Sequence, residues 1–255
     1  MTTAPRADLL DHPLITERYF FPRAARPRAR LDADAGDATL ACALHRSDPE
    51  GKVLVHFHGN GEVVADWQDG FPEVIARMGW DLLLAEYRGY GASTGEPALG
   101  RMLDDVAAVL RAAGPPERVV VFGRSVGSLF ALEAVARCPA VAGLVLESAI
   151  ADPLERLLLR VSPRELGVDA ATFEAAVAAR LDHRVKLNGY RGPVLVLHTR
   201  HDGLVDLSHA ERLASWAGDR AALHVFEAGD HNSILAENQE AYLGLLAGFL
   251  AEVAR

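Results

Sequence analysis

The sequence is poor in several features that mark secreted, membrane-bound and nucleic-acid-binding proteins. Only two of its 255 residues are cysteine, Cys42 and Cys138. They lie far apart in apolar segments, which excludes a disulfide framework and predicts buried thiols. Acidic residues outnumber basic residues by 35 to 26, for a net charge of −9, which argues against nucleic acid as a partner. No apolar run approaches the ~18 residues that a membrane span needs.

The N-terminal region also lacks a recognisable targeting signal. Residues 1–14 contain no apolar core of a signal peptide. Arginines and prolines between residues 22 and 30 could suggest a transit peptide, but a strand-like run over Ile15–Phe21 precedes them, so we interpret this stretch as a solvated loop. These absences predict a soluble cytoplasmic protein.

Strand-like and helix-like segments alternate through most of the chain. Ile15–Phe21 and Ala38–His45 are β-type runs, expected to form an antiparallel pair at a sheet edge. Runs of apolar residues predict buried strands over 52–58, 81–86, 118–122, 141–147, 193–198 and 222–226. Apolar residues at helical spacing predict helices over 63–78, 103–110, 128–135, 207–216 and 242–253. This order predicts a single α/β domain over residues 1–255, with a mostly parallel central sheet and helices on both faces.

One segment interrupts the alternation. Residues 151–192 contain helical spacing but no strand, and we interpret them as a small helical cap inserted into the domain. The apolar positions that define its two helical stripes are Leu154, Leu157, Leu158, Val161, Phe173, Val177 and Leu181. We expect most of these side chains to cover the sheet edge and the others to roof a pocket.

The strand expected at 118–122 stops at a Gly-x-Ser-x-Gly motif, Gly123 to Gly127. Between a strand and a helix, this motif is typical of a nucleophile elbow, in which the serine, here Ser125, has strained backbone geometry and an exposed hydroxyl. Side chains at Gly123 and Gly127 would collide with the neighbouring strand and helix. The same five residues could form an ordinary turn in which Ser125 caps the helix, but the context favours the elbow.

Two other polar groups follow late strands. Asp202 follows the strand expected at 193–198, and His231 follows the one expected at 222–226. The carboxyl ends of parallel strands share one edge of the sheet, so both should lie near Ser125. A serine hydroxyl needs a base, which an imidazole supplies, and a carboxylate can orient that imidazole. Alternatively, His231 is a loop histidine without a catalytic role, and Asp202 only forms the turn before Gly203.

Taken together, the motifs resemble the α/β-hydrolase family from about residue 50 onward. The matching elements are His58-Gly59-Asn60-Gly61, Tyr87-Arg88-Gly89-Tyr90-Gly91, Gly123-Arg124-Ser125-Val126-Gly127, His201-Asp202 with Val205, and Gly229-Asp230-His231-Asn232. The chain order of serine, acid and histidine is that of this fold. The sequence is similar to bacterial serine aminopeptidase-like hydrolases that have a His-Gly-Asn-Gly loop and a short cap. The resemblance implies a serine hydrolase whose catalytic residues are Ser125, Asp202 and His231.

The resemblance also implies an oxyanion hole made of two backbone N–H groups, those of Val126 and Asn60. Glu62 stands where the family often has a small residue. Its carboxylate either interacts favourably with the dipole of the following helix, or its charge shapes the entrance of the pocket. Glu147 ends the strand expected at 141–147, which follows the strand that leads to Ser125. It is an alternative to Asp202 as the carboxylate that orients His231, or it anchors the cap.

Other site classes are weakly indicated. His56 and His58 share a strand face, and His198 and His201 lie near another strand end, but a third metal ligand with suitable spacing is missing. The glycines at 89, 91 and 95 miss the dinucleotide fingerprint, and there is no P-loop motif. We therefore predict neither a metal nor an organic cofactor. The alternative from another class is a non-catalytic scaffold for ligand binding or regulation, because fold does not fix function.

The sequence thus predicts a hydrolase that cleaves a small or medium acyl ester, thioester or amide through an acyl-enzyme on Ser125. Its partner is a small-molecule acyl substrate. Two short helices can roof a pocket but can hardly build a long tunnel, so an apolar acyl site of limited length is expected.

Overall fold

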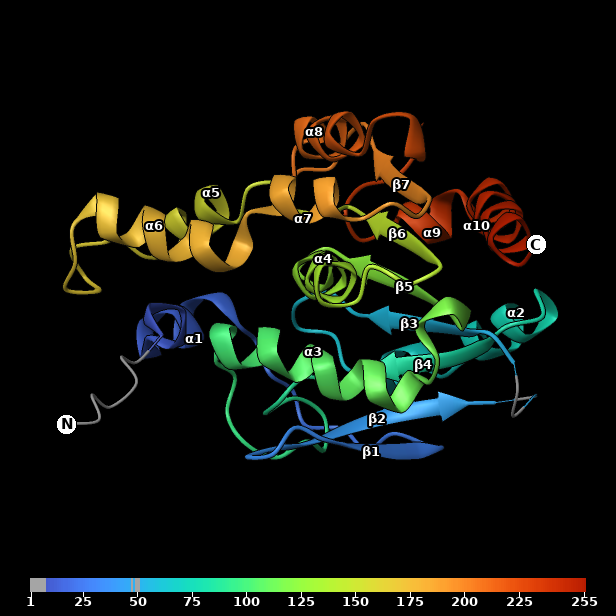
Figure 1. The fold of residues 1–255 in the computed structure, drawn as a ribbon, viewed down its shortest axis with the longest axis horizontal. Coiled ribbons are helices and arrows are strands. Elements are labelled where there is room, and N and C mark those ends of the chain that lie inside the picture. Colours follow the sequence, from blue (N-terminus) through green and yellow to red (C-terminus); the bar gives the residue numbers. More distant parts are fainter. Residues whose placement is uncertain (1–7, 47, 49–50) are drawn as a thin grey trace.

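Eight strands form one sheet in the order β1-β2-β4-β3-β5-β6-β7-β8 in the computed structural model, which describes residues 8–46, 48 and 51–255 (Figure 1). The strands are β1 (Arg30–Asp34), β2 (Thr39–His45), β3 (Val53–Phe57), β4 (Asp81–Ala85), β5 (Val119–Arg124), β6 (Gly143–Glu147), β7 (Val194–Thr199) and β8 (Ala221–Phe226). The β1–β2 and β2–β4 pairs are antiparallel, and the other pairs are parallel. The predicted α/β class with a mostly parallel sheet is confirmed.

Helices connect these strands along the chain. The α-helices are α1 (Pro13–Tyr19), α2 (Phe71–Arg77), α3 (Leu99–Ala113), α4 (Gly127–Arg137), α5 (Pro153–Leu158), α6 (Ala170–Leu181), α7 (His183–Gly189), α8 (Leu207–Ala217), α9 (Ile234–Glu237) and α10 (Gln239–Val253). Short 3-10 helices are η1 (Leu9–Asp11), η2 (Val64–Trp67), η3 (Pro116–Arg118) and η4 (Gly218–Arg220). No helix in the described ranges is both long enough and apolar enough to span a membrane.

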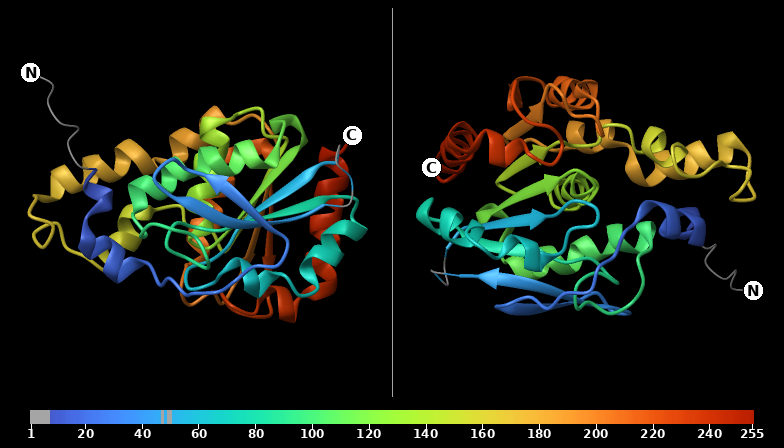
Figure 2. Two further views of the ribbon diagram at one scale, coloured as in Figure 1. Left: turned by 90° about the horizontal axis from the view of Figure 1, so that it is seen from below. Right: turned by 180° about the vertical axis from the view of Figure 1, so that it is seen from behind.

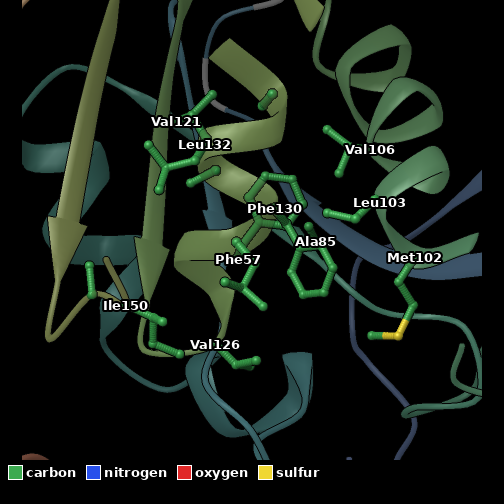
Figure 3. Close-up of a cluster of buried hydrophobic side chains, with 14 of the residues drawn as sticks. Phe57, Ala85, Met102, Leu103, Val106, Val121, Val126, Phe130, Leu132 and Ile150 are labelled. Carbon is green, nitrogen blue, oxygen red and sulfur yellow. The ribbon is translucent and has the colours of Figure 1, made fainter. Parts of the chain in front are cut away.

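Helices cover both faces of the sheet and divide the core into two clusters. Side chains from α3, α4 and α8 pack on one face, and side chains from α2 and α10 pack on the other. Figure 3 shows part of the first cluster, where Phe130 of α4 lies near Phe57 of β3 and Leu103 of α3. Because both faces are covered, every residue of β3 to β7 is buried. This burial explains why the central strands are continuous apolar runs in the sequence.

The prediction of a strand over Ile15–Phe21 is wrong, because most of this stretch is helix α1. Pro13 occupies the first turn, where its missing N–H costs nothing, and His12 Nδ1 accepts the N–H of Leu14 at 3.2 Å. Ile15 and Tyr19, one helical turn apart, are the buried residues of α1. Their β-branched and aromatic side chains favoured the strand, although their spacing of four fits a helix equally well.

The antiparallel partner of β2 is instead β1, a strand of five residues that the sequence pattern does not predict. The preceding arginine-rich stretch is an exposed loop, as predicted, and two of its arginines also contact the segment after β3. Arg23 Nη1 lies 2.7 Å from Asp66 Oδ2, and Arg28 Nη2 donates to the carbonyl of Gln68 at 2.9 Å.

Between β6 and β7 the described chain is helical, as expected. It forms three helices, whereas the two apolar stripes in the sequence predicted two. The last of them, α7, contacts α4 and α8 and so extends the helix layer on that face (Figure 1). Helices α5 and α6 project beyond the sheet toward α1 (Figure 2). Arg180 of α6 reaches Asp8, just before η1, at 2.7 Å.

Two local predictions also need correction. The helix expected over 63–78 divides into η2 and α2, and Gly70, with φ of 84°, lies at the break. Both cysteines are free thiols, as predicted, but only Cys42 is fully buried, whereas Cys138 is half-buried.

Candidate active site

Ser125 lies in the turn that joins β5 to α4 and has a φ of 52°. Its N–H donates to the carbonyl of Glu147 at 2.8 Å, which holds the turn against β6. A Cβ atom at Gly123 would lie 2.6 Å from the Ala131 Cβ, and one at Gly127 would lie 2.1 Å from the Phe57 carbonyl oxygen. Glycine at both positions therefore allows the close approach of β3, β5 and α4 that presents the serine.

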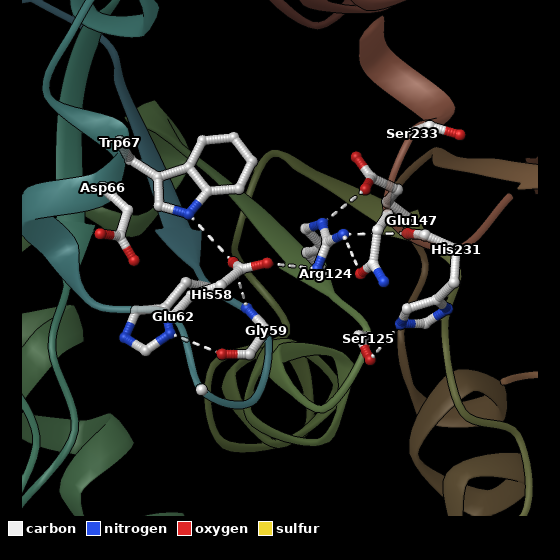
Figure 4. A network of polar contacts seen from close by, with 12 residues as sticks. His58, Gly59, Glu62, Asp66, Trp67, Arg124, Ser125, Glu147, His231 and Ser233 are labelled. Atoms are coloured by element: carbon white, nitrogen blue, oxygen red, sulfur yellow. Dashed lines mark hydrogen bonds and ion pairs between the residues drawn. The ribbon is translucent and has the colours of Figure 1, made fainter. Parts of the chain in front are cut away.

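The structure brings Ser125, His231 and Asp202 together from three separate loops. His231 Nε2 lies 2.9 Å from Ser125 Oγ, and His231 Nδ1 lies 2.8 Å from Asp202 Oδ2 (Figure 4 draws the serine–histidine contact). Asp202 Oδ1 accepts the N–H groups of Leu204 and Val205 at 2.9 and 2.8 Å. These two amides fix the carboxylate in the orientation that meets the imidazole.

The protonation of this array follows from its contacts. Burial raises the pKa of Asp202, but the hydrogen bonds from His231 and from the Val205 and Leu204 amides outweigh burial, so that the pKa is lowered. An ionised carboxylate only accepts, so His231 Nδ1 carries the hydrogen and Nε2 is free to accept from the serine hydroxyl. His198 lies 3.7 Å from Asp202 Oδ2, and burial lowers the pKa of its imidazole, which keeps it neutral.

Two backbone amides beside Ser125 have no partner. Within the described ranges, neither the Val126 N–H nor the Asn60 N–H donates a hydrogen bond, and both residues line the same cavity as Ser125. The Asn60 side chain is occupied elsewhere: Oδ1 accepts from the Phe21 N–H at 3.1 Å and from the Tyr90 hydroxyl at 3.0 Å. The side chain anchors the loop and leaves the main-chain amide available to a ligand.

A cavity of about 260 Å³ opens above Ser125. Its lining comprises Tyr19, Phe21, Asn60, Arg124, Ser125, Val126, Ile150, Arg156, Arg160, Leu204, Val205, His231 and Asn232. The apolar cap residues singled out from the sequence are not among them, and Leu158 is 46% exposed on the outside. Residues 151–192 instead contribute Arg156 and Arg160, so charged groups line the cavity together with apolar side chains such as Phe21 and Ile150, and the apolar acyl site stays a prediction.

Comparison with known proteins identifies the family. Residues 48–182, more than half of the chain, match the family model described as serine aminopeptidase, S33. The chain belongs to this family. The α/β-hydrolase resemblance inferred from its motifs is thereby confirmed.

Individual relatives of this S33 chain are distant. Human alpha/beta hydrolase domain-containing protein 17B is 25% identical over 219 residues, which cover 84% of this chain and 71% of the relative. The Escherichia coli protein YfhR is 24% identical over 192 residues, covering 70% and 62% of the two chains. Among solved structures, an esterase from Rhodococcus sp. ECU1013 aligns with a TM-score of 0.67 at 22% identity, covering 89% of this chain and all of the other. A Pyrococcus furiosus esterase aligns with a TM-score of 0.70 at 17% identity, covering 91% and 99%. These structural likenesses show the fold.

Arg124 stands inside the Gly-x-Ser-x-Gly motif of this S33 chain, but the motif itself predicts no role for it. Its guanidinium is buried and contacts three loops (Figure 4). Nη1 pairs with Glu62, Nε lies 3.0 Å from Glu147 Oε1, and Nη2 donates to the His231 carbonyl at 2.9 Å. A charged residue beside Ser125, at the end of a run of apolar residues, was the signal available in the sequence.

Neither interpretation of Glu62 describes its contacts. One carboxylate oxygen accepts the Gly59 N–H at 2.8 Å and the Trp67 indole N–H at 3.0 Å, while the other pairs with Arg124. The first helix after it, η2, begins only at Val64. Glu62 therefore holds the His-Gly-Asn-Gly loop to the elbow.

Glu147 does not contact His231. Its side chain is 1% exposed, accepts from the Tyr242 hydroxyl of α10 and pairs with Arg124. The idea that it anchors the cap is wrong as well, because Tyr242 belongs to the opposite side of the sheet. Of the two candidate acids, the structure places Asp202 against the histidine.

The histidines considered as metal ligands have protein contacts. His58 Nε2 lies 2.8 Å from Glu86 Oε1, and its Nδ1 lies 2.8 Å from the Gly59 carbonyl. The His56 ring lies against Trp67, with 4.3 Å between ring centroids. In the part of the chain that the structure describes, there is no group of three or more side chains placed to hold a metal ion.

Proposed function

We propose that the protein is a serine hydrolase that cleaves a small or medium acyl ester, thioester or amide. The observation that carries the proposal is the pair of contacts made by His231, 2.9 Å to Ser125 Oγ and 2.8 Å to Asp202 Oδ2. Membership of the S33 family and the free amides beside Ser125 support it.

In the proposed reaction, His231 Nε2 removes the hydroxyl proton as Ser125 Oγ attacks the substrate carbonyl carbon. The N–H groups of Val126 and Asn60 stabilise the negative charge on the carbonyl oxygen. The histidine then gives its proton to the leaving group, and the carbon–heteroatom bond breaks to leave an acyl-serine. Water attacks the acyl-serine by the same route and releases the acid. Asp202 stays ionised and stabilises the imidazolium.

Residues 151–192 serve in this proposal as the cap of a single hydrolase domain over residues 1–255. Arg156 and Arg160 at its inner side line the cavity above the nucleophile. Each chemical step uses only groups of this chain, so the proposed reaction needs no metal or organic cofactor. A reducing compartment such as the cytoplasm would suit the two free thiols.

A fluorophosphonate probe tests the proposal, because it forms a stable bond only with an activated serine. We expect stoichiometric labelling, mapped to Ser125 by mass spectrometry of the digested protein. Ser125→Ala should abolish labelling. Ser215→Ala, which removes an exposed hydroxyl on α8, should label like wild type. A folded wild-type protein that does not label would support the non-catalytic scaffold instead.

A further inference from the structure

Two arginines of the cap face the cavity beside Ser125. Arg156 lies on α5 and Arg160 follows that helix, and both line the cavity with Ser125 and His231. Over residues 8–46, 48 and 51–255, no ion pair involves either guanidinium, although acidic residues are frequent in the segment around them. The protein as a whole carries a net charge of −9, whereas the half-buried Arg156 and the exposed Arg160 place two positive charges at this cavity.

The neighbouring carboxylates are directed to other partners. Asp152 and Glu155 reach Arg212 of α8 at 3.4 and 3.5 Å. Glu165 pairs with Arg18 of α1 at 2.9 Å and also accepts from Ser162 at 2.8 Å. These three carboxylates are therefore engaged with other cations, and the charge of Arg156 and Arg160 is left for a ligand.

A third hydrogen-bond donor, Tyr19, lines the same cavity as the two arginines. Its side chain is 8% exposed. Burial raises the pKa of Tyr19 to about 12, against the opposing effect of Arg156 and Arg160 nearby, so the phenol keeps its hydrogen. Its hydroxyl donates to no other described residue, which leaves it available beside the two guanidiniums.

The frame that carries these donors is fixed. Arg18 Nη1 donates to the Arg160 carbonyl at 3.3 Å, so α1 holds the end of α5 in place. The Tyr19 carbonyl accepts from the Asn60 side chain, which connects the same segment to the loop that bears the free Asn60 amide. The donors and the reacting groups therefore lie on connected elements.

We propose that Arg156, Arg160 and the Tyr19 hydroxyl form a subsite for a carboxylate, and that the substrate carries such a group on its acyl chain or on its leaving group. A guanidinium matches a carboxylate with two parallel hydrogen bonds, which a neutral ester group cannot accept with equal strength. The inference rests on the proposed function, because it assigns the substrate class of the same site.

The first experiment measures selectivity between matched substrates. One arm compares mono-4-nitrophenyl glutarate with its methyl ester, which places the charge on the acyl chain. The other compares 4-carboxyphenyl butyrate with its methyl ester, which places it on the leaving group. In at least one arm, wild-type kcat/KM should favour the acid by tenfold or more. That ratio should fall at least tenfold in R156Q/R160Q and stay unchanged in R164Q, which removes an exposed arginine of the same cap outside the cavity lining.

A second measurement needs no turnover. Monomethyl glutarate should bind the S125A protein in isothermal titration calorimetry. It should bind the triple variant S125A/R156Q/R160Q at least tenfold more weakly, and its binding to S125A should weaken in 0.5 M salt. Fluorophosphonate labelling of the two arginine variants shows whether each retains the reactive serine.

The outcomes separate the two proposals. If Ser125 labels but acids and methyl esters react equally in both arms, or the ratio survives R156Q/R160Q, the carboxylate subsite is wrong while the hydrolase stands. If Ser125 does not label but monomethyl glutarate binds through the arginines, the subsite stands and the hydrolase fails. If Ser125 does not label and monomethyl glutarate does not bind, the hydrolase proposal and the subsite proposal are both wrong.

Discussion

Two buried carboxylates lie near the ends of neighbouring strands, and their contacts give them different tasks. Asp202, after β7, meets His231, whereas Glu147, at the end of β6, meets Arg124 and Tyr242. The sequence could not separate them, since both follow apolar strands on the same edge of the sheet. Which carboxylate reaches the histidine depends on the path of the loop after β7.

Asp202→Asn should therefore remove most of the activity, by up to ~10⁴-fold in kcat, because the amide can no longer hold the histidine in the required tautomer. Glu147→Gln should keep kcat within about tenfold, since it changes the support of Arg124 and not the imidazole. Steady-state hydrolysis of 4-nitrophenyl butyrate by the two variants makes the comparison. The reverse ranking would assign the acid to Glu147.

At the scale of elements, Arg124 joins the loop after β3, the end of β6 and the loop after β8. These three segments carry the Asn60 amide, the support of the elbow and the catalytic histidine of the proposed mechanism. One buried side chain thus sets their relative positions.

Arg124→Met should destabilise the protein by about 3–5 kcal/mol, because it leaves Glu147 buried without its cation. Arg101→Met is the matched control: Arg101 also pairs with two carboxylates, but its side chain is 59% exposed against 7% for Arg124. Surface pairs of that kind are worth at most about 1 kcal/mol. Urea unfolding of both variants measures the difference, and equal losses would contradict a central role for Arg124.

Most of the strands that the sequence predicted well are buried along their whole length. Every strand predicted from residue 52 onward is present, and β3 to β7 are continuous apolar runs because both of their faces are covered. The edge strand β8 is the exception, since only Phe226 of its six residues is fully buried. Helix α1 was mistaken for a strand because its buried stripe is only two residues long, and β1 was missed because four of its five residues are exposed or half-buried. The contacts of Arg124 and the inward direction of Arg156 depend on tertiary packing, which residue spacing does not encode.

At the scale of the whole molecule, the cavity lies between segments far apart in the chain. Helices α5 and α6 project beyond the sheet on the side of α1 (Figure 2), and Arg18 of α1 donates to the carbonyl of Arg160, 142 residues further along the chain. The enclosed volume of about 260 Å³ lies just below the range of ~300–1,000 Å³ usual for ligand sites.

This size predicts the response to acyl-chain length. Each methylene that fits should stabilise the transition state by about 0.8 kcal/mol, roughly fourfold in kcat/KM. With neutral 4-nitrophenyl esters, activity should rise from acetate to butyrate or hexanoate and then fall. A steady rise through palmitate would mean that the cap opens into a longer channel, and a flat series would mean that the leaving group or a charged group dominates selectivity.

The distance along the chain between Ser125 and its histidine also has a consequence for biosynthesis. The two residues are 106 positions apart, and His231 follows β8, the last strand of the sheet in the sequence. At ~5–20 residues per second, a ribosome needs roughly 5–20 s to pass from one to the other. When that interval begins, β3 and β5 have already been synthesised, and α4 follows within its first residues. The nascent polypeptide then contains Ser125 but not yet the histidine that would activate it. If the proposed function is right, the nascent chain has no hydrolase activity until β8 has paired with β7 and placed His231 beside Ser125. Reactivity toward esters would then report that the sheet is complete.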